Sequence, residues 1–268
     1  MQSLIIQNFK LFAPLQLGKK DTWAHLDTGA SGNMITATEA QALESIEKRV
    51  LQAGIGQQDV KQVRLSSLQF LGKRFDDTTA IVFDGDSYFG EVPFQISMTL
   101  GEDVLLAEPL VLDFKRLWVG YAKRHLREDL PSFALDCTSG LPFINLGWGQ
   151  RELSTIFDTG ASYCILNAAH LQELSALPPQ VYALEVRDPA GGQGEMPIYR
   201  LENLSIGEIR LGRCEAFIVN LEPVEQRLKK RIDFVLGANL MLTSALVWVL
   251  DKEHGRTLVS ERDVNVYA

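Results

Sequence analysis

The pentapeptide Asp-Thr-Gly-Ala-Ser occurs twice in this chain of 268 residues, beginning at Asp27 and again at Asp158. The two copies lie 131 positions apart, and each directly follows an apolar segment that predicts a short β-strand. Another apolar segment and a glycine-containing turn precede each of these strands, which together predict a hairpin. A chain that repeats this whole pattern is constrained to a fold built from two similar halves.

Other features recur in the same order after each pentapeptide. Helix-like stretches follow at 36–49, with Thr36 or Thr38 as the N-cap, and at 167–177, with Asn167 as the N-cap. Alternating apolar patterns then predict long hairpins, and each half continues with two apolar residues before a glycine and ends on Leu-Asp-x-x-x-Gly. These pairs of segments are 63–83 and 199–219, the elements ending at Gly120 and Gly237, and 135–140 and 250–255.

These repeated features indicate an internal duplication. We therefore predict two domains, at 1–138 and 139–268. Residues 84–110 have no evident counterpart in the second half, and their strand-like, glycine-punctuated pattern predicts an added hairpin or another insertion into the first lobe. We also expect the N-terminal strand at 3–9 and the C-terminal segment 263–268 to join a sheet that bridges the two lobes.

Composition excludes several classes of function. The formal net charge of −8 argues against nucleic acid as a partner, since phosphate binding needs a basic face. No apolar run approaches the roughly 18–20 residues needed to span a membrane. The N-terminus lacks the pattern of a secretory signal, and the three cysteines form no CxxC pair, so we expect free thiols in the cytoplasm. The four histidines form no HxxxH pair, and we expect neither a metal nor a cofactor.

The two aspartates point to a specific chemistry. If the halves pack about a pseudo-twofold axis, Asp27 and Asp158 meet at that axis. Two carboxylates in contact cannot both ionise easily, so they share one proton. The ionised member can then act as a general base on a water molecule while the protonated member polarises a carbonyl group. This pair would hydrolyse an amide bond without a metal.

With these motifs the chain resembles the aspartic proteases. Its Asp-Thr-Gly motifs are followed by alanine, at Ala30 and Ala161, and in this they resemble the retropepsin-like branch. Pepsin usually has serine at this position. The resemblance implies an all-β, pepsin/retropepsin-like acid protease fold. Two pseudo-twofold-related β-barrel lobes with short helices would flank a substrate cleft. Each predicted domain would then be one retropepsin-like lobe.

The resemblance also implies roles for individual residues. Asp27 and Asp158 would be the catalytic pair. Thr28 and Thr159 would support the catalytic loops by bonding across to the other lobe. Gly29 and Gly160 would line the substrate backbone. Gly120 and Gly237 would pack behind the two loops.

Glycine-rich turns in both halves are candidates for flaps that close over a substrate. In the first half the candidate tip is Gly54, Ile55 and Gly56, and in the second half it includes Gly191 and Gly192. The alternative for each is an ordinary glycine turn in a hairpin. Tyr88 is a rival candidate in the first half, because a pepsin-type flap carries a tyrosine near its tip.

We therefore expect an aspartic endopeptidase that binds peptides or proteins in an extended conformation. We expect a monomer with neither nucleic acid nor a membrane as a partner, although a homodimer of the two-lobed chain stays open. Because Ala30 and Ala161 offer no hydroxyl to the aspartates, we expect a mildly acidic to near-neutral pH optimum. The alternative function is a non-catalytic peptide-binding module that keeps the aspartic protease fold.

Overall fold

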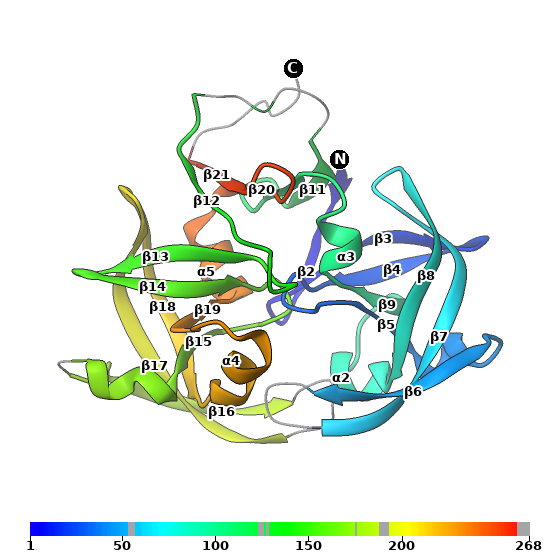
Figure 1. Ribbon diagram of the computed structural model, residues 1–268, viewed down its shortest axis with the longest axis horizontal. Coiled ribbons are helices and arrows are strands. Elements are labelled where there is room, and N and C mark those ends of the chain that lie inside the picture. The colour runs from blue at the N-terminus through cyan, green and yellow to red at the C-terminus, as the bar shows by residue number, and fades with distance from the viewer. Residues whose placement is uncertain (53–56, 123–125, 127–128, 175, 188–192, 262–268) are drawn as a thin grey trace.

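The computed structural model of the chain describes residues 1–52, 57–122, 126, 129–174, 176–187 and 193–261. Two sheet-rich lobes lie side by side, and strands from both halves form a further sheet beside them (Figure 1). This arrangement confirms the predicted fold class, which is mostly β with two lobes and short helices. No helix in the described ranges is long and apolar enough to cross a membrane.

The first lobe is an eight-stranded sheet, and one of its central strands ends directly before the first pentapeptide. Its two long strands alternate apolar and polar residues, because one face of each packs on the core. In spatial order the strands are β2 (Ile5–Gln7), β3 (Lys10–Leu17), β4 (Lys20–Leu26), β9 (Ile96–Leu100), β5 (Asn33–Thr36), β8 (Lys73–Phe83), β7 (Gln57–Phe70) and β6 (Ser45–Gln52).

The second lobe repeats this plan with seven strands. The hairpin before the pentapeptide, the parallel strand beside it and the long outer hairpin all have counterparts in the first lobe, as the duplication predicts. In spatial order the strands are β13 (Phe143–Trp148), β14 (Arg151–Phe157), β19 (Phe234–Leu236), β15 (Cys164–Asn167), β18 (Ile209–Val219), β17 (Gln193–Ile206) and β16 (Gln180–Arg187).

A third sheet of six strands joins the lobes. Of the predicted N-terminal strand at 3–9, only Ser3 takes part in it, within β1 (Gln2–Ser3), because the chain then turns into β2 of the first lobe. The predicted C-terminal strand at 263–268 lies outside the described residues. The remaining strands, in spatial order after β1, are β11 (Trp118–Tyr121), β10 (Leu110–Asp113), β20 (Val247–Asp251), β21 (Arg256–Ser260) and β12 (Ser132–Ala134). Because β10 pairs with β20, one strand from each half meets at the centre of this sheet.

The predicted inserted hairpin at 84–110 is wrong. This segment contains α2 (Gly85–Phe89), the central strand β9, and α3 (Glu102–Leu105). β9 lies between β4 and β5, and all five of its residues are buried. Its sequence, Ile-Ser-Met-Thr-Leu, alternates apolar and polar residues, which is typical of a strand with one exposed face. Ser97 and Thr99 are nevertheless fully buried, so the central place of this strand could not be recognised from periodicity.

Gly120 does not pack behind the first catalytic loop, contrary to the prediction. It lies in β11, opposite Val111 of the third sheet. Gly101, which follows β9, takes the predicted position instead, because a Cβ there would overlap the carbonyl oxygen of Gly32. The sequence pattern missed Gly101 because Thr99, two residues earlier, is polar.

Gly237 does lie behind the second catalytic loop, as predicted. A Cβ at this position would come within 2.5 Å of the carbonyl carbon of Tyr163. The helix that follows, α5 (Ala238–Ser244), begins with a hydrogen bond from Ala238 N to the carbonyl oxygen of Ala161 at 2.8 Å. In the first lobe, the equivalent hydrogen bond runs from Glu102 N to Ala30 O, also at 2.8 Å.

The closing motif of the first half also lies elsewhere than predicted. Asp113 at the end of β10 accepts hydrogen bonds from the backbone of the turn that follows it, as Asp251 does at the end of β20. Leu117 then has a left-handed backbone, with φ 56°, where Gly255 has φ 60° in the second half. The predicted motif at 135–140 instead follows β12, and the boundary between residues 138 and 139 stays a prediction.

The two helix-like stretches are shorter than predicted. The first yields only α1 (Ala37–Ala40), because the residues after it pair as β6 with β7. The second is a 3₁₀ helix, η1 (Ala168–Glu173), and the Asn167 side chain caps it by accepting from Ala169 N at 3.1 Å. At 36–49 the gain from sheet pairing outweighs the helix propensity of the alanine and glutamate residues.

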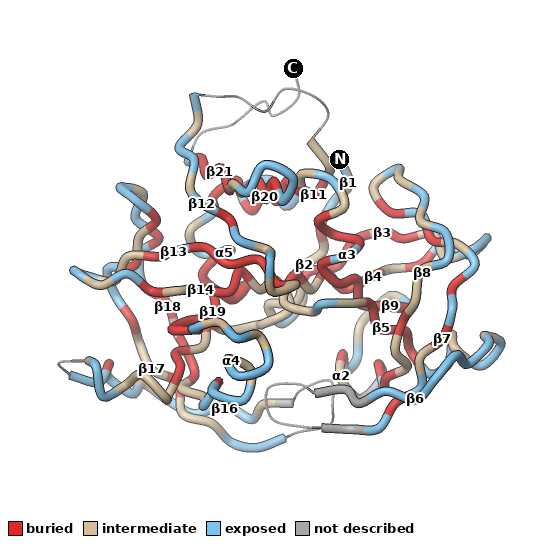
Figure 2. Tube along the Cα trace, viewed as in Figure 1, coloured by how far each residue is buried: buried red, intermediate tan, exposed pale blue. Residues whose placement is uncertain are grey.

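One continuous apolar core runs through both lobes (Figure 2). It passes the junction of the lobes where the ring of Phe157, next to the second pentapeptide, packs on Trp248 of β20 with the ring centroids 5.2 Å apart. Both side chains are fully buried. The strands that carry the two aspartates are therefore fixed in a common core rather than in two independent ones.

We expect Gly101→Ala to destabilise the protein, because the new methyl group would overlap a backbone oxygen that cannot move aside easily. Such overpacking costs about 1–3 kcal/mol, which lowers Tm by roughly 2–4 °C per kcal/mol in a chain of this size. Gly32→Ala is the matched control, since a Cβ there meets no atom within 4 Å. Thermal unfolding followed by circular dichroism measures both, and equal Tm values would contradict the position assigned to Gly101.

Candidate active site

Each aspartate is held at the end of its strand by the neighbouring parallel strand. Asp27 N donates to Leu100 O of β9, and Asp158 N donates to Leu236 O of β19, both at 3.0 Å. The backbone of each aspartate is therefore fixed at the same point of its lobe. This placement brings the two predicted catalytic residues to the junction of the lobes.

Thr28 and Thr159 bond across this junction in a reciprocal pattern, as predicted. Thr28 Oγ1 donates to Phe157 O at 2.7 Å and accepts from Thr159 N at 3.0 Å. Thr159 Oγ1 donates to Leu26 O at 2.9 Å and accepts from Thr28 N at 3.0 Å. Both threonines are fully buried. These four hydrogen bonds tie the loop that carries each aspartate to the strand that enters the other loop.

The carboxyl groups of Asp27 and Asp158 are hydrogen-bonded to each other. Asp158 Oδ1 also accepts from Gly160 N at 2.8 Å and from Ala161 N at 3.1 Å, and Asp27 accepts from the equivalent backbone groups. A Cβ on Gly29 would overlap the Asp158 carboxyl group, and one on Gly160 would overlap that of Asp27. Only glycine at these two positions lets the carboxyl groups approach one another.

This environment raises the pKa of both carboxyl groups. For Asp27 burial is the largest cause of the raised pKa, followed by the charge of Asp158 and the hydrogen bond between them. For Asp158 burial also raises the pKa, and the backbone N–H of Gly160 is the largest opposing influence. We therefore expect the two groups to titrate as a pair and to keep one proton to a pH above the usual range of an aspartate.

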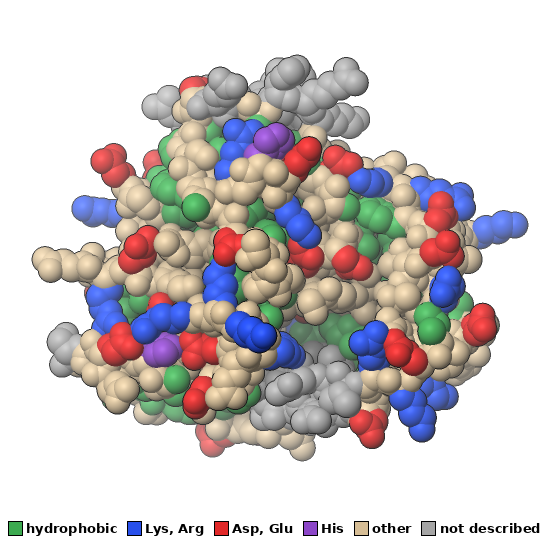
Figure 3. Space-filling view, viewed as in Figure 1, with side chains coloured by type: hydrophobic (Ala, Val, Ile, Leu, Met, Phe, Trp, Pro, Cys, Tyr) green, Lys and Arg blue, Asp and Glu red, His purple; other side chains and the backbone are tan. Residues whose placement is uncertain are grey.

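A cleft of about 1060 Å³ lies between the lobes, with the aspartates among its lining residues. Its mouth is the hollow in the lower centre of Figure 3, where hydrophobic side chains lie in the depth. Gly29 and Gly160 also line it, beside the aspartates. A cleft of this size is at the upper end of small-molecule sites and can hold several residues of an extended chain.

The arms of both predicted flap hairpins line this cleft. In the first lobe β6 and β7 pair up to Gln52 opposite Gln57, and in the second β16 and β17 pair up to Arg187 opposite Gln193. Figure 1 draws the two hairpins next to each other at the bottom of the view. The predicted tips, namely Gly54, Ile55, Gly56, Gly191 and Gly192, lie outside the described residues.

Tyr88 is not a flap tyrosine, contrary to the rival prediction. It lies in the helix α2 rather than in a hairpin, yet it lines the cleft. Its ring packs 6.0 Å from the imidazole of His25 and 4.9 Å from the ring of Phe89. Tyr88 therefore belongs to the cleft wall of the first lobe.

Sequence reasoning missed Lys10, which also lines the cleft. It lies two residues before the fully buried Phe12, which pairs with His25 of β4. The alternation of β3 was a usable signal, because residues 10 and 12 share a face of the strand and that face leads to Asp27.

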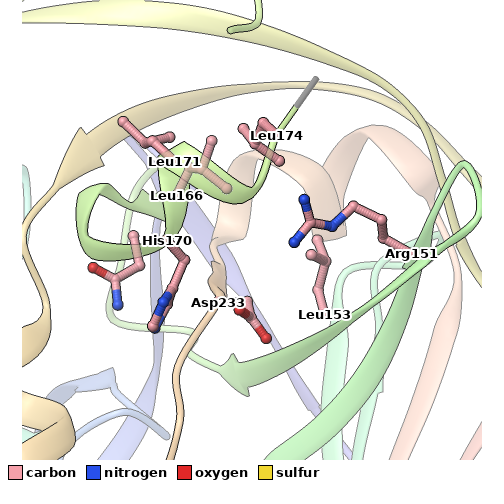
Figure 4. A pocket seen from close by; sticks show the side chains of 8 residues that line it. Arg151, Leu153, Leu166, His170, Leu171, Leu174 and Asp233 are labelled. Atoms are coloured by element: carbon pink, nitrogen blue, oxygen red, sulfur yellow. The ribbon is translucent and has the colours of Figure 1, made fainter. Parts of the chain in front are cut away.

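A second, small pocket lies on the outside of the second lobe (Figure 4). It measures about 10 Å³ and is bounded by His170 of η1, Arg151 of β14 and Asp233. His170 Nε2 lies 2.8 Å from a carboxylate oxygen of Glu225, in α4 (Glu222–Leu228). A space of this size holds at most about one water, so these charges support the fold. Across the described ranges, no group of three or more His, Cys, Asp and Glu is arranged to hold a metal ion.

We expect Thr28→Val to destabilise the protein more than Thr28→Ser. Valine has the shape of threonine but leaves Phe157 O and Thr159 N without their buried partner, at about 1–3 kcal/mol for each unsatisfied group. Serine keeps the hydroxyl group and loses only a methyl group. Urea unfolding of both variants measures the difference. A valine variant as stable as the serine variant would show that the threonine bonds do not hold the lobes together.

We expect Asp27→Asn to stabilise the protein at pH 7 but not at pH 4. Because the folded state raises the pKa of Asp27 above that in the unfolded chain, the aspartate lowers stability as the pH rises through this interval. Asparagine stays neutral, so the variant should gain about 2–4 °C in Tm at pH 7 for each kcal/mol of penalty removed. Asp21→Asn, at the exposed start of β4, is the control. A Tm difference that is the same at both pH values would contradict the raised pKa.

Comparison with known proteins agrees with this geometry. A search of curated proteins gave no match. The family model for aspartyl proteases, however, matches the chain twice, at residues 13–106 and 144–240. Each match contains one pentapeptide, most of the hairpin before it and the glycine behind its loop, and together they cover well over half of the chain. The chain therefore belongs to the aspartyl protease family.

Proposed function

We propose that this protein is an aspartic endopeptidase in which Asp27 and Asp158 activate one water molecule. The observation that carries the proposal is the contact between two carboxyl groups, one from each lobe, beside a cleft large enough for a peptide. A contact between two partly buried carboxyl groups is unfavourable for the fold unless they share a proton. That this contact joins the aspartates of the two copies of a duplicated motif favours a catalytic role.

The shared proton gives each carboxyl group a task. The ionised group removes a proton from water, and the resulting hydroxide attacks the carbonyl carbon of the scissile bond. The protonated group donates its proton to the carbonyl oxygen. When the C–N bond of the tetrahedral intermediate breaks, the proton taken from water passes to the leaving nitrogen. One of the two hydroxyl protons of the intermediate returns to the pair, and the other stays on the carboxylic acid product. The pair ends the cycle with one proton, as it began.

The substrate of this reaction would be a peptide in an extended conformation. β6 and β16 are the terminal strands of their sheets, and residues of both hairpin arms line the cleft. An extended peptide between them can form main-chain hydrogen bonds as an added strand does. Gly29 and Gly160 would face its backbone next to the bond that is cut.

The Ala of each pentapeptide supports the finer placement in the retropepsin-like branch. Ala30 and Ala161 stabilise the ionised aspartates only through their backbone N–H groups, because a methyl side chain donates nothing. The pair should therefore hold its proton to a higher pH than one that also accepts from a hydroxyl group. A mildly acidic to near-neutral working range follows from this difference.

A cytoplasmic monomer is the setting that we propose for this activity. All three cysteines are free thiols, and burial raises the pKa of Cys137 to about 11, which keeps that thiol protonated. Free thiols are typical of a reducing compartment. Because each chain supplies both aspartates, the proposed site is complete without a second copy.

A peptide library incubated with the protein between pH 3 and pH 8, with the products identified by mass spectrometry, tests the proposal. We expect internal cleavage with an optimum between about pH 4.5 and 7, since the raised pKa of the pair moves the singly protonated form upward. Asp27→Asn and Asp158→Asn should each reduce kcat by at least about 10³-fold, which is the scale on which loss of a proton-transferring group acts.

Two results would contradict the proposal. Cleavage that survives both substitutions would come from another site or from a contaminant. A folded protein that binds library peptides but cuts none over this pH range would instead be a peptide-binding module with an aspartyl protease fold.

A further inference from the structure

A strained turn places two residues at the cleft next to the catalytic pair. β2 and β3 are joined by Asn8 and Phe9, whose φ angles are 52° and 57°. A left-handed backbone is uncommon for a phenylalanine and persists only where its surroundings hold it. The Phe9 ring packs edge-on against Tyr163, 5.3 Å away, at the end of the second catalytic loop. The turn is thus fixed to the opposite lobe, and Asn8 and Lys10 line the cleft.

Lys10 has donor capacity that the fold does not use. Its Nζ donates to Tyr88 O at 3.3 Å and lies 3.9 Å from the centroid of the Tyr88 ring. Across the described ranges, no carboxylate oxygen lies within 4.0 Å of it. An ammonium group has three N–H donors, and these contacts occupy one of them. Burial lowers the pKa of Lys10 to about 8, and the charge of Asp27 opposes this shift, so the amine is charged below neutral pH.

The charge of Lys10 breaks the symmetry of the cleft. The hairpins β3–β4 and β13–β14 have the same register, so Lys10 and His25 of the first lobe correspond to Leu141 and Ile156 of the second. Both of these apolar residues line the cleft. The two walls therefore match around the aspartates but differ in this pair of positions. A peptide bound in one direction meets a cation on one side of the scissile bond and apolar groups on the other.

Other charged groups around the cleft do not take over this role. His25 is fully buried, and burial together with the charge of Lys10 lowers its pKa well below the usual range, so it is neutral. Arg49 already pairs with Glu47 at 2.6 Å. Arg227 lies exposed on α4, at the other wall of the cleft. Lys10 is therefore a half-buried cation in the wall that adjoins Asp27, and no carboxylate of the described part of the chain forms an ion pair with it.

We propose that Lys10 forms a subsite for a carboxylate group of the substrate peptide and so makes an acidic peptide, bound in one direction, the preferred substrate. This inference rests on the proposed function, because it names the substrate class of the same cleft. The carboxylate can come from an acidic side chain or from the C-terminus of the peptide. Either would accept a charge-assisted hydrogen bond from the free donors of Lys10 Nζ.

The test uses a cleaved parent peptide from the library. A series with Glu or Gln at each position on both sides of the cut measures recognition of a side-chain carboxylate, and peptides that end near the cut as a free acid or an amide measure that of a C-terminus. We expect kcat/KM to favour the acid by about tenfold or more at one position, the effect of one charge-assisted hydrogen bond. The preference should disappear in Lys10→Met and largely persist in Lys10→Arg.

Lys19→Met is the matched control, because Lys19 is exposed at the turn between β3 and β4 and does not line the cleft. It should keep the full preference for the acid. An acid preference that survives Lys10→Met, or its absence at every position in the wild type, would overturn the inference. If Lys10 acted only by packing on Tyr88, Met would be a better substitute than Arg and the acid-to-amide ratio would not change.

Binding separates this inference from the proposed function. The same acid and amide peptides are titrated by calorimetry into Asp27→Asn and into Asp27→Asn with Lys10→Met. Tighter binding of the acid that depends on Lys10 supports the subsite even if the wild type cuts nothing, in which case only the proposed catalysis fails. Cleavage without any dependence on Lys10 in either assay overturns the subsite and leaves the endopeptidase intact.

Discussion

The reciprocal hydrogen bonds of Thr28 and Thr159 are the interaction on which the rest of the site depends. Each hydroxyl group donates to the strand that enters the opposite loop and accepts from the opposite threonine N–H. Because these bonds are fully buried, any displacement of one lobe relative to the other would break several of them at once. These hydrogen bonds keep the carboxyl groups of Asp27 and Asp158 in contact, although two ionised carboxyl groups would repel each other. The chemistry of the pair is a consequence of this constraint, and glycine at positions 29 and 160 makes room for it.

The duplication is close in backbone but not in side chains, and the differences have consequences. Behind the first loop, Asn33 Oδ1 accepts from Gly101 N, whereas behind the second, Asn239 Oδ1 accepts from Cys164 N, both at 3.0 Å. An asparagine thus supports the same junction from opposite sides in the two lobes. Lys10 departs from the symmetry within the cleft itself. A single chain can hold such differences, whereas a symmetric pair of identical chains would carry the same residue on both walls.

Much of the fold and the centre of the site could be predicted from the sequence. The pentapeptides located both aspartates and both threonines, because these residues must lie directly after a strand. The sequence failed where local patterns were ambiguous. The pattern of two apolar residues before a glycine pointed to Gly120 rather than to Gly101, because Thr99 in β9 is polar although it is buried. Residues 36–49 have helix propensity that pairing with β7 overrides. The position of Lys10 depends on its contact with Tyr88 and on the packing of the neighbouring Phe9 against Tyr163, which no local pattern contains.

The central claim is that Asp27 and Asp158 share one proton as a coupled pair. A titration of their side-chain carboxyl carbons by ¹³C NMR tests it most directly, with Asp27→Asn and Asp158→Asn used to assign the signals. The account predicts that both signals respond in two common steps, and that the second proton leaves well above the usual pKa of an aspartate. Two independent single-step titrations near the usual value would contradict it.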